Sequence, residues 1–304
     1  MRERIGSAIA GAAEFLASRQ LHSGEIDVLR SIDPDMREAR RYPTVFGSAI
    51  AVLSLQHSAH IVLQPLVARA GRFLVEQRRG DGTWSYWLKP EESASDADDS
   101  ACCSLALLRS GHLPAGEIHR NIPIFEAYRT TSGLFQTWFH EWTNDVDGVV
   151  NANVVGYLGE RSSTEAAIEF VAGLIRDGPD AGAIPYYVDR AALYYATARA
   201  LHRAPRLREC EGALMELLRN RAVRPAGTVL PIAQSLAALA LCGCSLLPEF
   251  SPTIDWLLGK QNRNGSWPLE AWYTGPDPSG APSGLYGSEE LSTVLCLESL
   301  LRAT

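Results

Sequence analysis

Three carboxylates, Asp96, Asp98 and Asp99, lie directly before an apolar run that extends from Cys102 to Leu108. Aspartate and serine before an apolar run are typical of a helix start, where a side-chain oxygen caps free backbone N–H groups. A third acid exceeds what a cap needs, because like charges a few Å apart repel and raise the pKa of one group. A carboxyl group that stays protonated near neutral pH is a proton donor, so this stretch predicts a general acid.

The composition narrows the class of protein. The chain has 304 residues, of which 46% are hydrophobic, and this is enough for a sizeable core. The net charge of −7 argues against nucleic acid as the main partner. The longest apolar stretch, from Val229 to Leu247, is interrupted by Pro231 and Gln234, so it predicts a buried helix and no transmembrane segment. Nothing at the N-terminus resembles a signal peptide, and we expect a cytoplasmic protein.

The six cysteines lie in or beside apolar helical runs. No pair has the spacing of a zinc site, and no histidine lies near one at ligand spacing. We therefore expect buried thiols and no metal site.

The elements that position the acids form a loose repeat. Each unit has an amphipathic helix, a connection rich in Gly, Pro or aromatic residues, and a more apolar helix, over about 40–50 residues. Six helix pairs predict an all-α fold, the α6/α6 toroid, with the apolar helices inside, as one domain over 1–304. The outer helices are expected at 4–19, 64–78, 115–129, 164–176, 207–220 and 251–260, and the inner helices at 47–56, 97–109, 147–158, 187–202, 230–242 and 288–302. No stretch alternates with period two, so strands are not expected.

A closed ring would bring the starts of the inner helices to one rim. Asp147 and Asn151 lie four residues apart, so they would share a helix face. Tyr187 and Tyr194 lie seven apart and would also project together, and Tyr286 precedes the last inner helix. The predicted rim is acidic and aromatic.

Two segments end an outer helix in the same way. Gln261, Gly265 and Trp267 match the Q-x-x-x-G-x-W repeat of triterpene cyclases, and Gln77 to Trp84 resembles it. The physical sense of this repeat is local: Gln bonds unpaired backbone groups at the helix end, Gly permits a sharp exit, and Trp packs over the turn.

The acidic stretch carries a more specific resemblance. Residues 96–101 resemble the D-x-D-D-T-A motif of class II terpene cyclases, the group of squalene–hopene cyclase and copalyl diphosphate synthase, with Ser100 in place of Thr. The resemblance implies an acid-initiated terpene or meroterpenoid cyclase, of isomerase or lyase type, in which Asp98 protonates an alkene or epoxide. Asp96 and Asp99 would tune and orient it. It implies a hydrophobic isoprenoid substrate and no cofactor, apart from Mg²⁺ if the substrate carries a diphosphate.

The carbocation formed in such a reaction needs aromatic faces around it. Candidates in the connections and inner helices are Trp84, Trp87, Trp138, Trp142, Tyr187, Tyr194, Trp272 and Tyr286. Together with Asp147 and Asn151, they are the side chains that we expect to bind substrate.

The length of the chain allows one barrel, whereas complete class II cyclases pair two. A single barrel must close its cavity with its own long connections, at 17–44, 84–95 and 267–287, or with a second copy in a homodimer.

Two other functions remain open from the residues alone. Barrels of this kind also carry paired carboxylates of carbohydrate-active hydrolases and lyases, and Asp98 with Asp147 or Asp189 could form such a pair. The other hypothesis is a non-catalytic barrel that binds a lipid or a partner protein. A deep, dry, aromatic cavity would favour the cyclase, and an open polar groove would favour the sugar enzyme.

Overall fold

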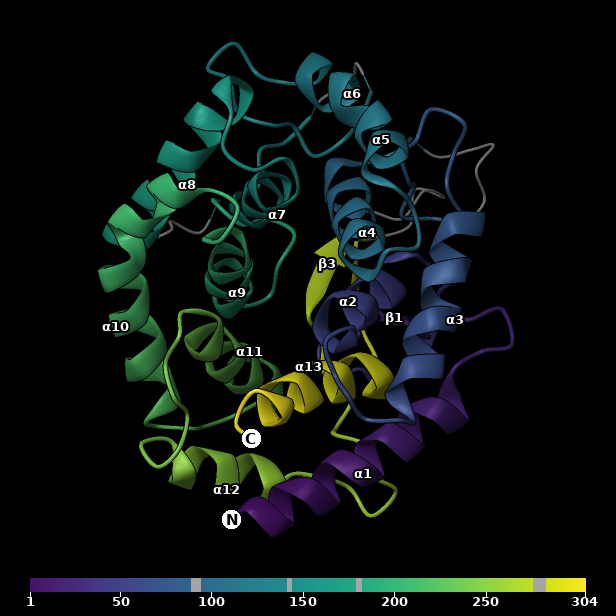
Figure 1. Ribbon diagram of the computed structural model, residues 1–304, viewed down its shortest axis with the longest axis vertical. Coiled ribbons are helices and arrows are strands. Elements are labelled where there is room, and N and C mark those ends of the chain that lie inside the picture. The colour runs from purple at the N-terminus through teal and green to yellow at the C-terminus, as the bar shows by residue number, and fades with distance from the viewer. Residues whose placement is uncertain (89–93, 141–143, 179–181, 276–282) are drawn as a thin grey trace.

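Six inner helices form a closed ring in the computed structural model, which describes residues 1–88, 94–140, 144–178, 182–275 and 283–304 (Figure 1). Each inner helix packs against the next, and the last packs against the first. These helices are α2 (Phe46–Leu55), α4 (Ala97–Ser110), α7 (Gly148–Leu158), α9 (Ala191–Ala200), α11 (Val229–Leu241) and α13 (Glu289–Leu301). The predicted α6/α6 toroid is confirmed.

A second layer of helices surrounds this ring (Figure 1). The inner helices α2 and α7 are buried over their whole length, whereas outer helices such as α3 and α8 bury one face only. This difference explains the apolar and amphipathic patterns of the two sets. The outer helices are α1 (Arg2–Arg19), α3 (Leu63–Glu76), α5 (Ala115–Ile118), α6 (Ile122–Ala127), α8 (Glu165–Asp177), α10 (Glu211–Ala222) and α12 (Ser251–Gly259).

The third outer element differs from the expected single helix over 115–129. It is divided into α5, the 3₁₀ turn η1 (His119–Asn121) and α6. Pro123 lies in the first turn of α6, where its missing N–H costs nothing, but it could not continue a helix from α5. Two further 3₁₀ turns, η2 (Ser162–Thr164) and η3 (Pro205–Cys210), precede α8 and α10.

The fourth inner helix begins later than predicted. Helix α9 starts at Ala191, whose backbone N–H donates to Oδ1 of Asp189 at 2.7 Å. Tyr187 lies before the helix and forms an isolated bridge with Tyr273. The prediction that Tyr187 and Tyr194 share a helix face was therefore wrong, because the period of 3.6 does not apply outside the helix.

A small antiparallel sheet, not expected from the sequence, joins the first and last long connections. Its order is β2-β1-β4-β3, and in its centre Arg30 pairs with Tyr286, which pairs with Tyr273 on the other side. These strands are two to four residues long, which is too short for a period-two pattern. They are β1 (Leu29–Ser31), β2 (Arg40–Arg41), β3 (Tyr273–Gly275) and β4 (Gly284–Gly287).

The turns after the outer helices show why Gln and Trp recur there. Nε2 of Gln261 donates to the carbonyls of Gly265, in its own turn, and Ala8, on α1, both at 2.9 Å. Gln20 bonds Gly24 in its turn and Leu66 on α3 in the same way, at 2.9 and 3.0 Å. Each of these glutamines thus ties a helix end to the next outer helix.

Across the described segments, no helix combines the length and apolar character needed to cross a bilayer.

Candidate active site

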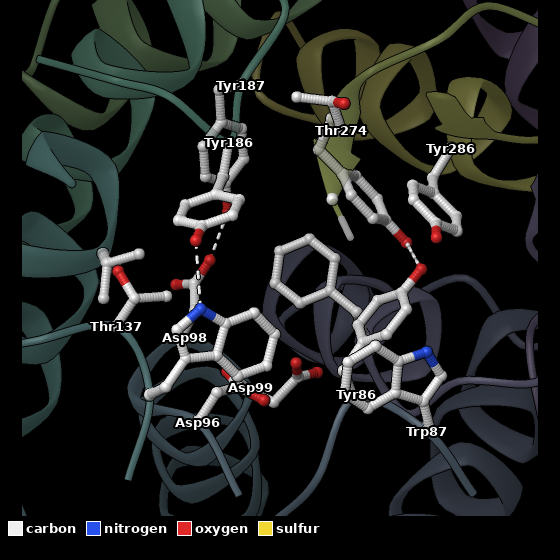
Figure 2. A pocket seen from close by; sticks show the side chains of 15 residues that line it. Tyr86, Trp87, Asp96, Asp98, Asp99, Thr137, Tyr186, Tyr187, Thr274 and Tyr286 are labelled. Carbon is white, nitrogen blue, oxygen red and sulfur yellow. Dashed lines mark hydrogen bonds between the residues drawn. The ribbon is translucent and has the colours of Figure 1, made fainter. Parts of the chain in front are cut away.

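The start of α4 places the three carboxylates at one end of the ring. Asp96 is the N-cap, and its Oδ1 accepts a hydrogen bond from the backbone N–H of Asp99 at 2.8 Å. Asp98 points into a cavity that all three acids line (Figure 2). The local sequence therefore has two roles: Asp96 starts the helix, and Asp98, two residues further along, faces the cavity.

Both oxygens of Asp98 accept hydrogen bonds. Nδ2 of Asn153, on α7, lies 2.6 Å from Oδ1, and the hydroxyl of Tyr187 donates to Oδ2. Asn153 is itself held by Arg199 on α9, whose Nη2 lies 2.8 Å from Oδ1 of the amide. The Arg199 guanidinium is buried and lies 4.6 Å from the centre of the Tyr195 ring. A polar chain thus leads from Asp98 into the interior of the ring.

The cavity has a volume of about 60 Å³, and aromatic rings form most of its wall. Asp98 lies on one side, and Tyr86 and Tyr286 lie on the other (Figure 2). Trp87 and Trp138 stack with ring centres 5.6 Å apart, and Tyr273 and Tyr286 stack at 5.3 Å. Its aromatic residues are Phe46, Tyr86, Trp87, Trp138, Tyr186, Tyr187, Tyr273 and Tyr286, and the others are Asp96, Asp98, Asp99, Thr137, Val150, Thr274 and Gly275.

Burial raises the pKa of every carboxyl group in this cluster. For Asp98, hydrogen bonds from Tyr187 and Asn153 and the charge of Arg199 oppose the rise in pKa. Burial raises the pKa of Asp96 to about 7, and burial with the Asp96 charge raises the pKa of Asp99 well above its usual range. Since two coupled acids cannot both ionise cheaply, Asp99 is the group that favours its protonated form.

Several residues expected at the site lie in this cavity. Trp138, Tyr187 and Tyr286 line it together with the three aspartates. Trp272 lies behind the wall, with its ring packed against Phe46 and Tyr187. Trp142 lies outside the described residues.

Three other expected residues do not line the cavity. Trp84 is fully buried in the turn after α3, and its Nε1 donates to the carbonyl of Leu74 at 2.8 Å. Asn151 bonds the backbone N–H and carbonyl of Phe135, both at 3.0 Å. Tyr194 is buried on α9. These side chains support the ring. They were expected at the site because a sequence pattern predicts the face of a helix on which a residue lies, but not which neighbouring element covers that face.

Asp147 also has a structural position. It caps α7, and its carboxylate accepts hydrogen bonds from the backbone N–H groups of Val149 at 2.6 Å, Val150 at 3.1 Å and Tyr186 at 3.1 Å. Burial raises its pKa to about 7, against the effect of these donors. Asp147 therefore fixes the segment that carries Tyr186 and Tyr187.

Sequence reasoning missed Phe46, Tyr86, Tyr186 and Tyr273 in the wall, and Asn153 and Arg199 behind Asp98. Asn153 and Arg199 had a signal, because each is a polar residue in a largely apolar inner helix. The described residues contain no group of three His, Cys, Asp or Glu side chains arranged to hold a metal ion.

No protein-family model and no curated protein sequence matches the chain. Solved structures do. A variant of the type II terpene cyclase MstE from Scytonema, in complex with geranylgeranyl dihydroxybenzoate, has a TM-score of 0.78 at 15% identity over 99% of this chain and 98% of that one. The chain has a class II terpene cyclase-like fold.

Two further solved structures are similar to this fold at lower TM-scores. The ent-copalyl diphosphate synthase from Streptomyces platensis has a TM-score of 0.58 at 18% identity, over 85% of this chain and 50% of that one. An alpha-amylase from Clostridium perfringens has a TM-score of 0.63 at 11% identity, over 98% of both chains. At such identities the likeness concerns the fold, so the function must be argued from the site.

Proposed function

We propose that the protein is a class II-type isoprenoid cyclase that makes a terpene or meroterpenoid. Asp98 protonates a terminal alkene or epoxide of a polyprenyl substrate, and the carbocation that results cyclises. The observation that carries this proposal is the place of Asp98, whose carboxyl group points into a cavity walled by eight aromatic side chains. Burial in such a wall raises the pKa of Asp98 and so favours the protonated form that can donate to an alkene.

The partners of Asp98 suit an acid that must ionise during the reaction. When the proton leaves, the carboxylate keeps the hydrogen bonds from Asn153 and Tyr187. Donors to the charged form, together with the buried Arg199 cation, stabilise the conjugate base and so strengthen the acid. Burial destabilises the ionised form of Asp98 and these donors stabilise it, so the two act in opposite directions on its pKa.

The rest of the cavity suits a cation. Aromatic faces attract positive charge by about 0.5–2 kcal/mol each, most when water is excluded. The described residues that line the cavity include no Arg, Lys or His that would repel the cation. One proton enters the substrate, and the final cation loses one, so the simplest product is an isomer of the substrate.

The carbohydrate-active alternative has less support. Asp147 would be the second acid, but three backbone N–H groups already bind its carboxylate. Asp189 accepts a hydrogen bond from the backbone N–H of Ala191 and pairs with Arg221 at 2.6 Å. A sugar site needs many hydrogen-bonding groups, whereas the wall around Asp98 is aromatic.

The test is turnover of the purified protein beside its Asp98→Asn variant. Substrates would be geranyl, farnesyl and geranylgeranyl diphosphate, squalene and, because MstE binds it, geranylgeranyl dihydroxybenzoate. We expect a cyclised product, detected by mass spectrometry, that the variant does not form. Equal product from a folded Asp98→Asn variant would contradict the role of Asp98.

A further inference from the structure

A second pocket lies beside the active-site cavity, between the starts of α9 and α11. Its volume is about 340 Å³. Met36, from the connection between β1 and β2, lines it together with Thr228 and Leu230, and Gln234 reaches it from the inner helix α11. Neither the acid chemistry nor the cation chemistry proposed above uses this pocket.

The partition between the two spaces is thin. Tyr187 and Tyr273 line the active-site cavity, while their chain neighbours Val188 and Trp272 line the second pocket. The backbone N–H of Val188 donates to the carbonyl of Trp272 at 3.1 Å and joins the two segments. The Trp272 ring lies 5.9 Å from that of Tyr187, which donates to Asp98. One indole therefore separates the second pocket from the partner of the acid.

The second pocket contains buried polar atoms that lack hydrogen bonds. Gln234 is 1% exposed, and neither Oε1 nor Nε2 has a partner among the described residues. Trp272 is 3% exposed, and its Nε1 is likewise without one. Folded proteins leave few such atoms unpaired, and each exception calls for an explanation. The amide can donate and accept, and the indole N–H only donates.

The charges of this pocket disfavour an anionic ligand. Its described lining includes three carboxylates, those of Asp35, Asp189 and Glu270, and no Arg, Lys or His. The Glu270 carboxylate accepts from the N–H groups of Val229 and Leu230 at 2.7 and 2.9 Å. Diphosphates and carboxylates are bound in proteins by cationic donors, which this lining lacks.

We propose that the second pocket binds the head group of the substrate, and that this head group is neutral and both donates and accepts hydrogen bonds, as a hydroxylated aromatic ring does. The prenyl chain then lies in the aromatic cavity beside Asp98. A ligand that occupies both spaces turns the Trp272 indole aside and brings partners to Gln234 and to the indole N–H. This inference rests on the proposed cyclase function, whose substrate class it specifies.

The experiment uses binding, so that it does not depend on turnover. In the Asp98→Asn background, dissociation constants are measured for three ligands that share a geranylgeranyl chain: the hydroquinone, the diphosphate and a hydrocarbon without a polar head. We expect the hydroquinone to bind most tightly. Gln234→Leu should weaken it roughly tenfold, the effect of one or two lost hydrogen bonds, and leave the hydrocarbon unchanged.

Two further variants separate this role from a structural one. Trp272→Phe keeps an aromatic side chain but removes the N–H, so it should weaken the hydroquinone alone. Gln64→Leu, on the exposed face of α3, is the matched control and should change nothing. Gln234→Leu should also raise the melting temperature of the ligand-free protein, because it removes two unpaired buried atoms.

The outcomes distinguish the two proposals. Preference for the diphosphate, or equal weakening of all three ligands by Gln234→Leu, would overturn the head-group site even if the protein cyclises a substrate. Tight, Gln234-dependent binding of the hydroquinone, with no product from the wild type, would support the head-group site and overturn the cyclase.

Discussion

The guanidinium of Arg199 decides which end of the Asn153 amide faces Asp98. Arginine can only donate hydrogen bonds, so the atom 2.8 Å from its Nη2 must be the amide oxygen of Asn153. The amide nitrogen is then the atom 2.6 Å from Oδ1 of Asp98. Asn153 is thereby fixed as a donor, which favours the ionised form of Asp98. Arg199 acts on the acid through its charge and through this orientation.

Replacement of Arg199 tests this relationship. In Arg199→Gln the pKa of Asp98 should rise, because the cation that lowers it is gone. Activity requires protonated Asp98 and falls as pH rises through that pKa, so the alkaline limb of the pH profile should move to higher pH. The weaker acid should also lower kcat, by at most about tenfold for each unit of pKa.

Arg199→Lys is the control, since it keeps the charge but presents one nitrogen at a different place. It should restore the position of the pH limb more than it restores kcat. A pH profile that does not move in Arg199→Gln, with the fold intact by circular dichroism, would leave Arg199 with a structural role only.

Two tyrosines in the same cavity form a matched pair. The hydroxyl of Tyr187 donates to Asp98, whereas the hydroxyl of Tyr86 pairs with that of Tyr273 at 3.0 Å on the opposite side. Tyr187→Phe keeps the aromatic face and removes a donor to the ionised acid, so kcat should fall by about tenfold, the effect of a hydrogen bond to a charged group. Tyr86→Phe should change kcat by less than about threefold. Similar losses in the two variants would argue against a role for the Tyr187 hydroxyl in the acid chemistry.

The fold was predictable because it repeats. Six alternations of amphipathic and apolar helices gave the ring, and most helix boundaries fell within a few residues of those expected. The failures have local causes: Pro123 divides the third outer helix, and the bond from Ala191 to Asp189 starts α9 after Tyr187. The small sheet escaped prediction because its pairing joins β1 to β4 across the whole chain.

The candidate site was predictable only where a motif carried it. Asp96, Asp98 and Asp99 have a recognisable spacing, and they do line one cavity. An aromatic residue has no such signal, since Trp84 in a turn and Trp138 in the cavity wall look alike in sequence. Which rings face the cavity depends on how connections far apart in the chain fold over the ring, and no local pattern encodes that.

The last prediction concerns Asp147 and the pH dependence of stability. Burial raises its pKa in the folded protein from 3.8 to about 7. The folded state therefore holds a proton that the unfolded state loses between these values, so the contribution of Asp147 to stability is complete below pH 4 and declines as pH rises to 7. The decline amounts to roughly 4 kcal/mol at most, since one pKa unit corresponds to 1.36 kcal/mol.

The measurement is urea unfolding of the wild type and of Asp147→Asn at pH 5 and pH 8. The variant still caps α7 but does not titrate, so its free energy of unfolding should change less between the two pH values than that of the wild type. If wild-type stability relative to the variant instead increases with pH, the three backbone donors to Asp147 outweigh its burial, and the carboxylate is ionised in the folded protein. Because Asp147 holds the segment of Tyr186 and Tyr187, either result also shows whether the protonation state of Asp147 affects the stability of the cavity wall beside Asp98.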